Sequence, residues 1–356
     1  MLIIDAHLDL AWNALQWNRN LQQSVYTIRT AESELTEAGR GQSTVALPEM
    51  RKGRVALCFA TVLARSTGHA VPNLDYSSPL QAYAATQGQL NYYRALHDTG
   101  EIRLIHNLYE LNEHIVAWQD WEKESLQSQP QPGLVISMES ADPILKPDQL
   151  PAWTEAGVRI IGPAHYRAGR YAGGTSTELG LTPDGLALLR EMEGLRIILD
   201  LTHLSDQAFW EALEIFSGVV LASHNNCRAL VPHQRQFNDE QIRAIIERDG
   251  VIGAAFDNWM IRPGWGRGAK EKPPVIMAHV VEHIDHVCQL AGDSQHAAIG
   301  SDLDGGFGRE QSPADLDTIA DLQHITEILS ARGYSDTDIA SIMHGNWLRL
   351  LRRAWK

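Results

Sequence analysis

Histidines and carboxylates stand at the ends of several short apolar runs in this chain of 356 residues. They are His7, Asp9, Glu139, His165, Asp200, His203, His224, Asp302 and Asp304. Imidazole and carboxylate groups without a thiolate are typical ligands of a catalytic Zn²⁺, Mn²⁺ or Fe²⁺, because structural zinc usually recruits cysteine. If the fold brings these run ends together, the pattern predicts a metal-dependent active site.

The pair His7 and Asp9 illustrates how the whole set must be judged. Two residues apart on a strand, both side chains lie on one face and can reach the same ion. An isolated H-x-D is a weak signal, because the same spacing is common in turns and on surfaces. His or acidic residues at the ends of six of eight apolar runs, however, favour a shared site over polar groups that only satisfy strand ends.

Eight apolar runs would position these groups, and they span residues 1–7, 55–64, 133–140, 158–165, 195–203, 218–224, 250–256 and 296–305. Their continuous apolarity indicates parallel strands buried on both faces. Helical spacing between them predicts helices such as 182–194, 205–215 and 238–248. The alternation predicts an α/β fold, a (β/α)8 TIM barrel with inserted loops, in which residues 1–356 form a single catalytic domain whose active site lies at the carboxyl ends of the strands. A doubly wound sheet is the weaker alternative, because no glycine-rich dinucleotide loop follows the first run.

Three segments are expected to leave the barrel: 13–50, the polar stretch 122–133, and 259–274, which is rich in Gly, Trp, Pro and Lys. The third would be either a lid over the site or an ordinary surface loop. Four tryptophans would either line a pocket or, as is more common, serve packing: Trp12, Trp17, Trp259 and Trp265.

Two further patterns are expected not to be functional sites. His279, His283 and His286 have the spacing of a helical metal site, but they lie on the helix that leads into the eighth run, in the outer layer and away from the mouth. Ser223 beside His224 would suggest a nucleophile pair, but neighbouring strand residues point to opposite faces and the sequence has no G-x-S-x-G elbow.

The overall composition narrows the function classes. Hydrophobic residues make up 44% and charged residues 21%, as in a folded globular chain, and a net charge of −14 without a long basic run disfavours nucleic acid as a partner. Three cysteines are too few and too scattered for a disulfide framework. Since no secretory leader precedes His7 and no apolar stretch has membrane-spanning length, we expect a cytoplasmic protein with a small-molecule substrate and no membrane partner.

The order of motifs resembles the membrane dipeptidase (renal dipeptidase) family, metallopeptidase M19. The resemblance covers nearly the whole chain and rests on H-x-D at His7, VISMES, GPAH, DLTH, ASHNN, HQRQFNDE, IGSDLDG and the late HGNWLRLL. It implies a (β/α)8 barrel that carries two divalent metal ions, most often zinc, and hydrolyses dipeptides, including some with a C-terminal D-residue. It also implies a homodimer.

The same resemblance implies a role for each matching residue. His7 and Asp9 would hold the first metal, His203 and His224 the second, and Glu139 would bridge them. His165 would polarise the scissile carbonyl and stabilise its oxyanion, Arg235 would bind the substrate carboxylate, and Asp302 would be the acid/base, with Asp304 as structural support. A paired-metal site of this kind would supply a metal-bridged water of lowered pKa as the nucleophile.

Departures from the family pattern keep two other functions open. Gly169 stands where the family usually has asparagine, and Gln236 rather than asparagine follows Arg235. Arg167 and Arg170 would either favour acidic substrates or belong to a solvated loop. The nearer alternative is an amidohydrolase-type enzyme acting on a cyclic amide, a lactone or an N-acyl amino acid, and the distant one is a non-catalytic barrel scaffold.

Overall fold

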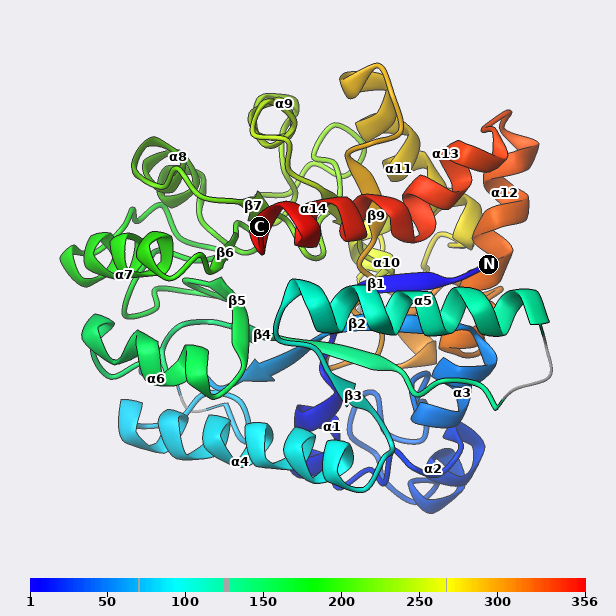
Figure 1. The fold of residues 1–356 in the computed structure, drawn as a ribbon, viewed down its shortest axis with the longest axis horizontal. Helices are drawn as coiled ribbons and strands as arrows, with labels where there is room; N and C mark the ends of the chain where they lie inside the picture. The colour runs from blue at the N-terminus through cyan, green and yellow to red at the C-terminus, as the bar shows by residue number, and fades with distance from the viewer. Residues whose placement is uncertain (70, 125–127, 267) are drawn as a thin grey trace.

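Parallel strands alternate with helices in the computed structural model, which describes residues 1–69, 71–124, 128–266 and 268–356 (Figure 1). The eight predicted runs are all strands over part of their length: β1 (Ile3–Leu8), β2 (Val55–Leu63), β4 (Gly133–Glu139), β5 (Val158–Gly162), β6 (Ile198–Asp200), β7 (Val220–Leu221), β8 (Ile252–Ala254) and β9 (Ala297–Ile299). The carboxyl-terminal part of most runs is not strand, so most of the polar residues lie on the loops that follow, whereas His7, Glu139 and Asp200 lie within strands.

The strands follow one another around the barrel in sequence order. Parallel pairing joins β1, β2, β4, β5, β6 and β7, and it joins β8 to β9. A parallel bridge between Ala222 and Ile252 links β7 to β8, and the Asp302 amide donates to the carbonyl of His7 at 3.2 Å, which brings the last strand back to β1. The predicted (β/α)8 barrel is confirmed, and the doubly wound alternative is excluded.

One strand escaped the sequence analysis. β3 (Arg103–Leu104) pairs with the first residues of β4. Its two residues are too short to give the apolar run from which the other strands were predicted.

The three helices named from the sequence are confirmed as α7 (Pro183–Gly194), α8 (Asp206–Ile215) and α9 (Asp239–Glu247). Asn238 and Gln241 form a reciprocal capping box at the start of α9. The other helices are α1 (Leu10–Gln16), α2 (Val25–Ala31), α3 (Leu47–Lys52), α4 (Pro79–Asp98), α5 (Leu108–Glu124), α6 (Leu150–Glu155), α10 (Asn258–Ile261), α11 (Met277–Ala291), α12 (Ile325–Ala331), α13 (Asp336–Ala340) and α14 (Asn346–Ala354). Short 3₁₀ turns lie at Pro147–Gln149, Arg309–Gln311 and Ile319–His324, and a π turn lies at Ser341–Gly345.

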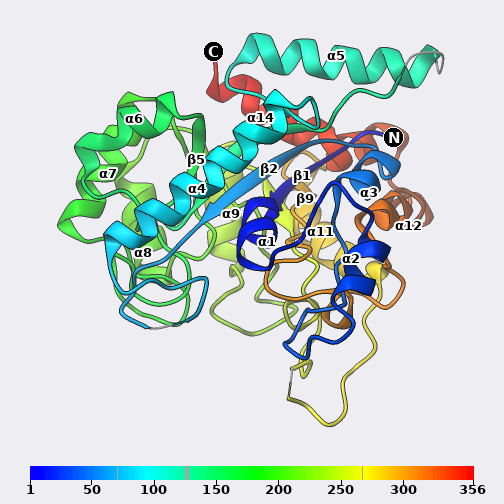
Figure 2. The same cartoon turned by 90° about the horizontal axis from the view of Figure 1, so that it is seen from below.

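Helix α14 covers the end of the barrel where the strands begin. Trp347 is fully buried there, its ring packs edge-on against Phe59 of β2 with centroids 5.2 Å apart, and its Nε1 donates to the carbonyl of Ile299 in β9. Figure 2 shows α5 and α14 at one end of the molecule, while the loop after α10 projects at the other. One end of the barrel is therefore closed, and the opposite end is left for the site.

The predicted excursions differ in what they contain. Segment 13–50 holds α2 and parts of α1 and α3. Residues 125–127 of the second segment and residue 267 of the third lie outside the described residues. Among the described residues, no helix combines the length and apolarity needed to cross a membrane.

Candidate active site

The strand ends deliver the predicted residues to one mouth. His7 lies in β1, Glu139 ends β4 and Asp200 ends β6, whereas the other candidates lie on the loops that follow their strands. They line or adjoin a cavity of about 640 Å³, whose lining includes Asp9, Glu139, His165, His203, His224, Arg235 and Asp302. Because the carboxyl ends of parallel barrel strands converge, residues up to almost 300 positions apart in sequence meet there.

An uncommon backbone conformation orients two of these residues toward the cavity. His203 and Asp302 have φ angles of 69° and 58°, in the left-handed region that side chains other than glycine seldom adopt. Such conformations persist where the surrounding structure holds them, and they concentrate at functional sites. The left-handed residue turns the chain sharply after the strand.

Glu139 lies at the centre of the site, close to three of its histidines. Its Oε2 lies 3.6 Å from His7 Nε2, and its Oε1 lies 3.2 Å from His203 Nε2 and 3.5 Å from His224 Nε2. Among the described residues, three groups have ligand atoms close enough to hold one ion each: His7 with Asp9 and Glu139, Glu139 with His203 and His224, and His7 with His224 and Asp302. The first two groups share Glu139 and are the two sets that the resemblance implies.

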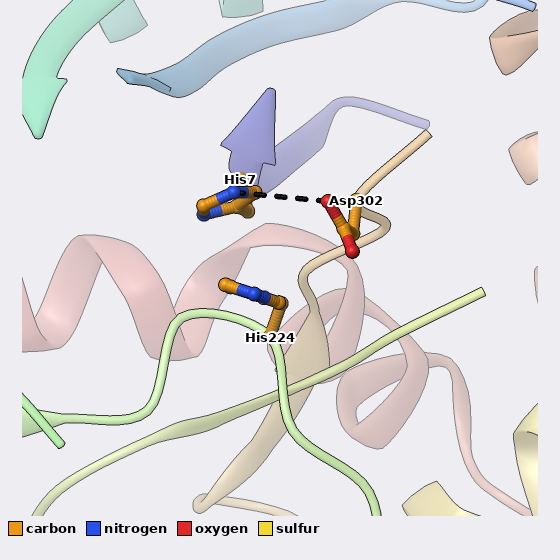
Figure 3. A group of neighbouring side chains, drawn as sticks. All are labelled: His7, His224 and Asp302. Atoms are coloured by element: carbon orange, nitrogen blue, oxygen red, sulfur yellow. Dashed lines mark ion pairs between the residues drawn. The ribbon is translucent and has the colours of Figure 1, made fainter. Parts of the chain in front are cut away.

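The third group is shown in Figure 3, where His7 and His224 face each other and Asp302 approaches His7 from the side. Asp302 Oδ1 lies 3.7 Å from His7 Nε2, and the two imidazole centroids are 3.7 Å apart. The same geometry therefore allows Asp302 either to bind an ion or to act beside it.

Hydrogen bonds at the Nδ1 atoms of His203 and His224 orient both rings. Thr175 Oγ1 lies 3.1 Å from His203 Nδ1, and Ser223 Oγ lies 2.9 Å from His224 Nδ1. Each hydroxyl has another acceptor in reach, so it can accept the Nδ1 proton and leave the lone pair of Nε2 free. The two Nε2 atoms lie 3.1 Å apart. The expectation that Ser223 and His224 point to opposite faces is wrong, because β7 ends at Leu221 and strand alternation does not extend to them.

His7 lies among negative charges. Burial disfavours its charged form, yet Glu139, Asp9 and Asp302 outweigh that effect and raise the pKa of His7 to about 10. Neither of its ring nitrogens has a hydrogen-bond partner within the described part of the chain. A buried imidazole without a partner, surrounded by carboxylates, fits a site that takes up a cation.

The other groups of the mouth divide by charge. Burial, together with nearby positive charge, lowers the pKa of His203 and His224 well below the usual range, so both rings are neutral and can act as ligands. Burial opposes ionisation of Glu139, but the positive charge of His7 holds the pKa of Glu139 well below its usual value. Burial and the carboxylates of Asp9 and Glu139 raise the pKa of Asp302, although His7 acts in the opposite direction.

These observations satisfy the requirements of a site for divalent cations. The possible ligand atoms are nitrogen and oxygen only, and they lie close to one another. Several of the carboxylates among them are buried, where a bound cation would stabilise their negative charge. Charges this deeply buried are stable only when they are paired or bind a metal. The residues present therefore fit the metal ions that the resemblance implies.

His165 is held differently from the other histidines. Arg65, which follows β2, donates from Nη1 to His165 Nδ1 at 2.9 Å, while His165 Nε2 lies 3.5 Å from Glu139 Oε1. Burial, together with the positive charge of Arg65, lowers the pKa of His165 to about 3 even though Glu139 favours the charged form. The ring is therefore neutral.

Arg235 lines the cavity from the loop after β7. Its Nη1 donates to Asn225 Oδ1 at 2.6 Å and its Nη2 donates to the His224 carbonyl at 2.9 Å, whereas its buried Nε has no partner within the described residues. Gln236, a departure from the family pattern, bonds to the backbone of Asn226 and Met260. The departure therefore belongs to the loop that supports the arginine.

The loop after His165 contains the other departure, Gly169, and the two arginines Arg167 and Arg170. Gly169 donates to the Ala172 carbonyl within a short β arm, and a Cβ at this position would approach Asp142 Oδ1 to 3.0 Å. Arg170 donates to the backbone carbonyls of Asp142, Ile144 and Leu145 and lies outside the cavity lining of the described residues. Arg167 is exposed and lines the cavity.

Asp304 is buried and accepts five hydrogen bonds from the first excursion: from Arg19 Nη1, Ser43 Oγ, Thr44 N, Thr44 Oγ1 and Val45 N. These contacts tie the loop after β9 to segment 13–50. The geometry agrees with the structural support expected of Asp304.

Three of the four tryptophans line the cavity, namely Trp12, Trp259 and Trp265. Trp17 instead packs against the guanidinium groups of Arg19 and Arg40. The third excursion therefore contributes to the wall of the cavity through Trp259 and Trp265, whichever of the two expected roles it has.

The three histidines of α11 make separate contacts, as the sequence analysis expected of an outer helix. His283 Nδ1 accepts from the Cys227 amide, and its Nε2 lies 3.2 Å from the Ile261 carbonyl. His286 pairs with Asp239, and His279 Nδ1 accepts from the Ile276 amide. None of them belongs to a candidate metal group among the described residues.

Sequence reasoning missed three residues of the site: Arg65, Thr175 and Asp257. Asp257 lines the cavity and accepts a hydrogen bond from Gln311, and Thr175 supports His203. Arg65 and Asp257 follow predicted strands, so a search for charged residues of either sign after every run would have found both. Thr175 lies within a loop and gives no such signal.

The fold and the mouth together define a (β/α)8 barrel of the metal-dependent hydrolase type. The model of one protein family, described as membrane dipeptidase (peptidase family M19), matches residues 1–356. The chain belongs to this family, and the resemblance drawn from the motifs is confirmed.

Individual relatives agree with that assignment. An uncharacterised protein in the pqqA 5' region of Klebsiella pneumoniae is 33% identical over 215 residues, which cover 58% of this chain and 76% of that protein. Dipeptidase tcpJ of Claviceps purpurea is 30% identical over 200 residues, which cover 55% of this chain and only 44% of the fungal protein.

Solved structures share the fold over the full length. The crystal structure of a dipeptidase of family M19 has a TM-score of 0.80 at 22% identity and covers 100% of this chain and 99% of that one. A metallopeptidase from Rhodobacter sphaeroides, liganded with a phosphinate mimic of the dipeptide L-Ala-D-Ala, has a TM-score of 0.79 at 22% identity, with the same coverage.

Proposed function

We propose that this protein is a metal-dependent dipeptidase and that residues 1–356 form one catalytic domain. The observation that carries the proposal is the double use of Glu139, which belongs to two adjacent groups of potential metal ligands in a cavity that also contains a buried arginine. A cavity of about 640 Å³ is in the range of small-molecule sites.

The ligand sets follow from the groups around Glu139. His7 and Asp9 would hold one divalent ion, His203 and His224 the other, and Glu139 would bind both through its two oxygens. When bound, the two ions, which we propose to be zinc, supply a Lewis acid for the scissile carbonyl and lower the pKa of the attacking water. The free Nε2 lone pairs of His203 and His224 support this assignment.

The other residues of the mouth would act on the substrate. His165 donates a hydrogen bond from Nε2 to the carbonyl oxygen and stabilises the negative charge that develops there. Asp302 takes a proton from the attacking water and delivers it to the leaving amine, since an unprotonated amine leaves poorly. The raised pKa of Asp302 supports a group that both accepts and returns a proton.

Arg235 would select short substrates. A permanently charged, forked guanidinium binds a carboxylate strongly, so Arg235 would hold the free C-terminus of a dipeptide one residue beyond the scissile bond. The L-Ala-D-Ala mimic bound by the Rhodobacter sphaeroides structure supports the extension to dipeptides with a C-terminal D-residue. Because Arg235 Nη1 and Nη2 already hold the loop, the unpartnered Nε marks the side of the guanidinium with hydrogen-bonding capacity left.

The proposal is tested by metal analysis together with assays on L,L- and L,D-dipeptides. We expect two equivalents of metal per chain, loss of activity on chelation and recovery with Zn²⁺. An active, metal-free protein would contradict the mechanism. Activity confined to cyclic amides, lactones or N-acyl amino acids would favour the amidohydrolase alternative, and a protein without metal or hydrolytic activity would favour a scaffold.

A further inference from the structure

We propose that Arg65 is a positioning residue that fixes His165 as a hydrogen-bond donor toward the substrate and so keeps this histidine out of the metal ligand set. The inference deepens the proposed function, because it rests on the role given above to His165. Arg65 has no counterpart among the motifs from which the family was recognised.

The proton positions on His165 follow from the chemistry of its partner. An arginine has five N–H donors, no acceptor, and stays protonated. Since Arg65 Nη1 lies 2.9 Å from His165 Nδ1, that nitrogen must offer its lone pair. A neutral imidazole then carries its proton on Nε2, which faces Glu139 Oε1 at the mouth.

The neighbouring histidines have the opposite arrangement. Hydroxyl groups lie behind Nδ1 of His203 and His224, and a hydroxyl can accept the Nδ1 proton. Their Nε2 atoms then present lone pairs, which a metal requires, whereas the Nε2 of His165 presents N–H, which a developing oxyanion requires. The residue that bonds to Nδ1 thus makes His203 and His224 potential metal ligands and His165 a hydrogen-bond donor. The three rings nevertheless lie close together, with the His165 and His203 centroids 4.2 Å apart.

Arg65 is itself held on several sides. Its amide donates to the Leu74 carbonyl and its carbonyl accepts from the Tyr76 amide, both at 2.8 Å. Its guanidinium is buried and lies 3.5 Å from Asp75, a carboxylate that also accepts hydrogen bonds from the backbone and hydroxyl of Thr67. A group fixed in this way needs no reorganisation when the substrate arrives, which is the condition for an effective positioning residue.

Removing the guanidinium should impair catalysis and leave binding intact. We expect Arg65→Met to lower kcat by about 100-fold, as the loss of one oxyanion donor does, with KM changed less than about threefold because Arg235 still binds the carboxylate. Since the substitution leaves Asp75 buried without its cation, Arg65→Met/Asp75→Asn provides a variant without that unpaired charge. Arg29→Met is the matched control: Arg29 pairs with Asp317 at 2.9 Å, lies outside the cavity lining of the described residues, and should leave kcat unchanged.

A double-mutant cycle shows whether Arg65 acts through His165. If it does, Arg65→Met should cost less than about threefold in a His165→Ala background, because there is no ring left to position. An equal loss of kcat in both backgrounds, or full kcat in Arg65→Met/Asp75→Asn, would overturn the proposal.

A spectroscopic readout separates this proposal from the function on which it rests. In zinc-loaded protein with ¹⁵N-labelled histidine, two-bond ¹H–¹⁵N correlation should show His165 with a bare Nδ1 and a protonated Nε2, its signal being identified by its absence in His165→Gln. Arg65→Met/Asp75→Asn should abolish this single tautomer. The same tautomer in the variant, or a protonated Nδ1 in the wild type, would contradict the role of Arg65, whereas inactivity of the wild type toward every dipeptide would contradict the proposed function alone.

Discussion

The histidines of the mouth differ from one another in the partner of each Nδ1 atom. His203 and His224 have hydroxyl groups behind them, His165 has a guanidinium, and His7 has no partner within the described chain. Side chains of one type thereby obtain different chemistry, since the partner decides which nitrogen holds the proton. The role of each of these three histidines is therefore determined by the residue that bonds to its Nδ1 atom, namely Thr175, Ser223 or Arg65.

The first prediction concerns Asp302, which the geometry places both in a potential ligand group and beside the reacting centre. We expect Asp302→Asn to retain both metal ions and to lose at least about 100-fold in kcat, because the amide cannot take up the proton of the attacking water. Metal content and kcat are measured on the same preparation. Loss of metal in the variant would instead identify Asp302 as a ligand, and undiminished kcat would remove it from the mechanism.

The second prediction concerns Arg235. We expect Arg235→Met to raise KM for free dipeptides by about 10- to 100-fold, the value of a lost charged hydrogen bond, and to change KM for C-terminal amides little. Comparison of the two substrate series is the measurement. Because Arg235 also donates to the His224 carbonyl, metal content must be unchanged for the comparison to count. An equal rise in KM for both series would show that Arg235 does not bind the carboxylate.

Much of the candidate site could be predicted from residue types alone. Most candidates from His7 to Asp302 line the cavity or contact a residue that does, because they stand at or just after a strand end, whereas Arg235 lies on the loop well beyond β7. The position of Arg65 after β2 could be found in the same way, but its role could not be assigned, since its partner His165 is 100 residues away in sequence and nothing local indicates their contact. The pairing of Ser223 with His224 was predicted wrongly because strand alternation was applied beyond the end of β7.

At the scale of elements, short strands form the barrel wall and the loops after them carry most of the site residues. β6, β7 and β9 contain two or three residues each, and the chain then leaves the barrel wall before it presents His203, His224 and Asp302. The left-handed conformations of His203 and Asp302 make the turns at these two residues. A sequence pattern locates such a strand well, but the backbone angle of the residue after it depends on contacts that the pattern does not contain.

The third prediction concerns the contact of α11 with the loop after β7. Burial lowers the pKa of His283 to about 4, below the ordinary value of 6.5, so the folded state favours the neutral ring. The stabilisation is therefore complete above pH 6.5 and is lost as the pH falls toward 4, in total about 3 kcal/mol. Protonation of Nδ1 would also break its bond from the Cys227 amide.

Urea unfolding at pH values between 7 and 4 measures this effect. We expect His283→Gln, whose amide can accept from Cys227 and donate to Ile261, to be less sensitive to acid than the wild type. His324→Gln, at an exposed position, serves as the control and should follow the wild type. Parallel acid sensitivity in all three proteins would exclude His283 as a cause.

At the scale of the whole molecule, the barrel depends on the helix that closes its floor. Trp347 of α14 is fully buried against Phe59 and bonded to the carbonyl of Ile299. We expect Trp347→Ala to lower the free energy of unfolding by about 4 kcal/mol, since it leaves a large cavity and an unmatched carbonyl. Equilibrium urea unfolding is the measurement.

An exposed tryptophan provides the control for that experiment. Trp210 is 42% exposed, and Trp210→Ala should change the free energy of unfolding by less than about 0.5 kcal/mol. A similar small change in Trp347→Ala would show that α14 is not needed to close the barrel.

The architecture was predictable because eight continuous apolar runs leave few alternatives to a parallel barrel. The two-residue β3, the packing of α14 against the floor and the tie between Asp304 and segment 13–50 were not, since each depends on contacts between distant segments. Zinc as the metal, the homodimer and the cytoplasmic location stay predictions.

The helix that closes the barrel floor is synthesised after all the strands that it covers. β1 and β2 are translated first, yet Phe59 is covered by Trp347, which follows every strand in the sequence. The inner apolar surface at that end must therefore stay open to solvent, or to a chaperone, while the rest of the barrel is being made. We expect a nascent chain stalled before α14 to remain sensitive to protease, and the barrel floor to close only when α14 has emerged from the ribosome.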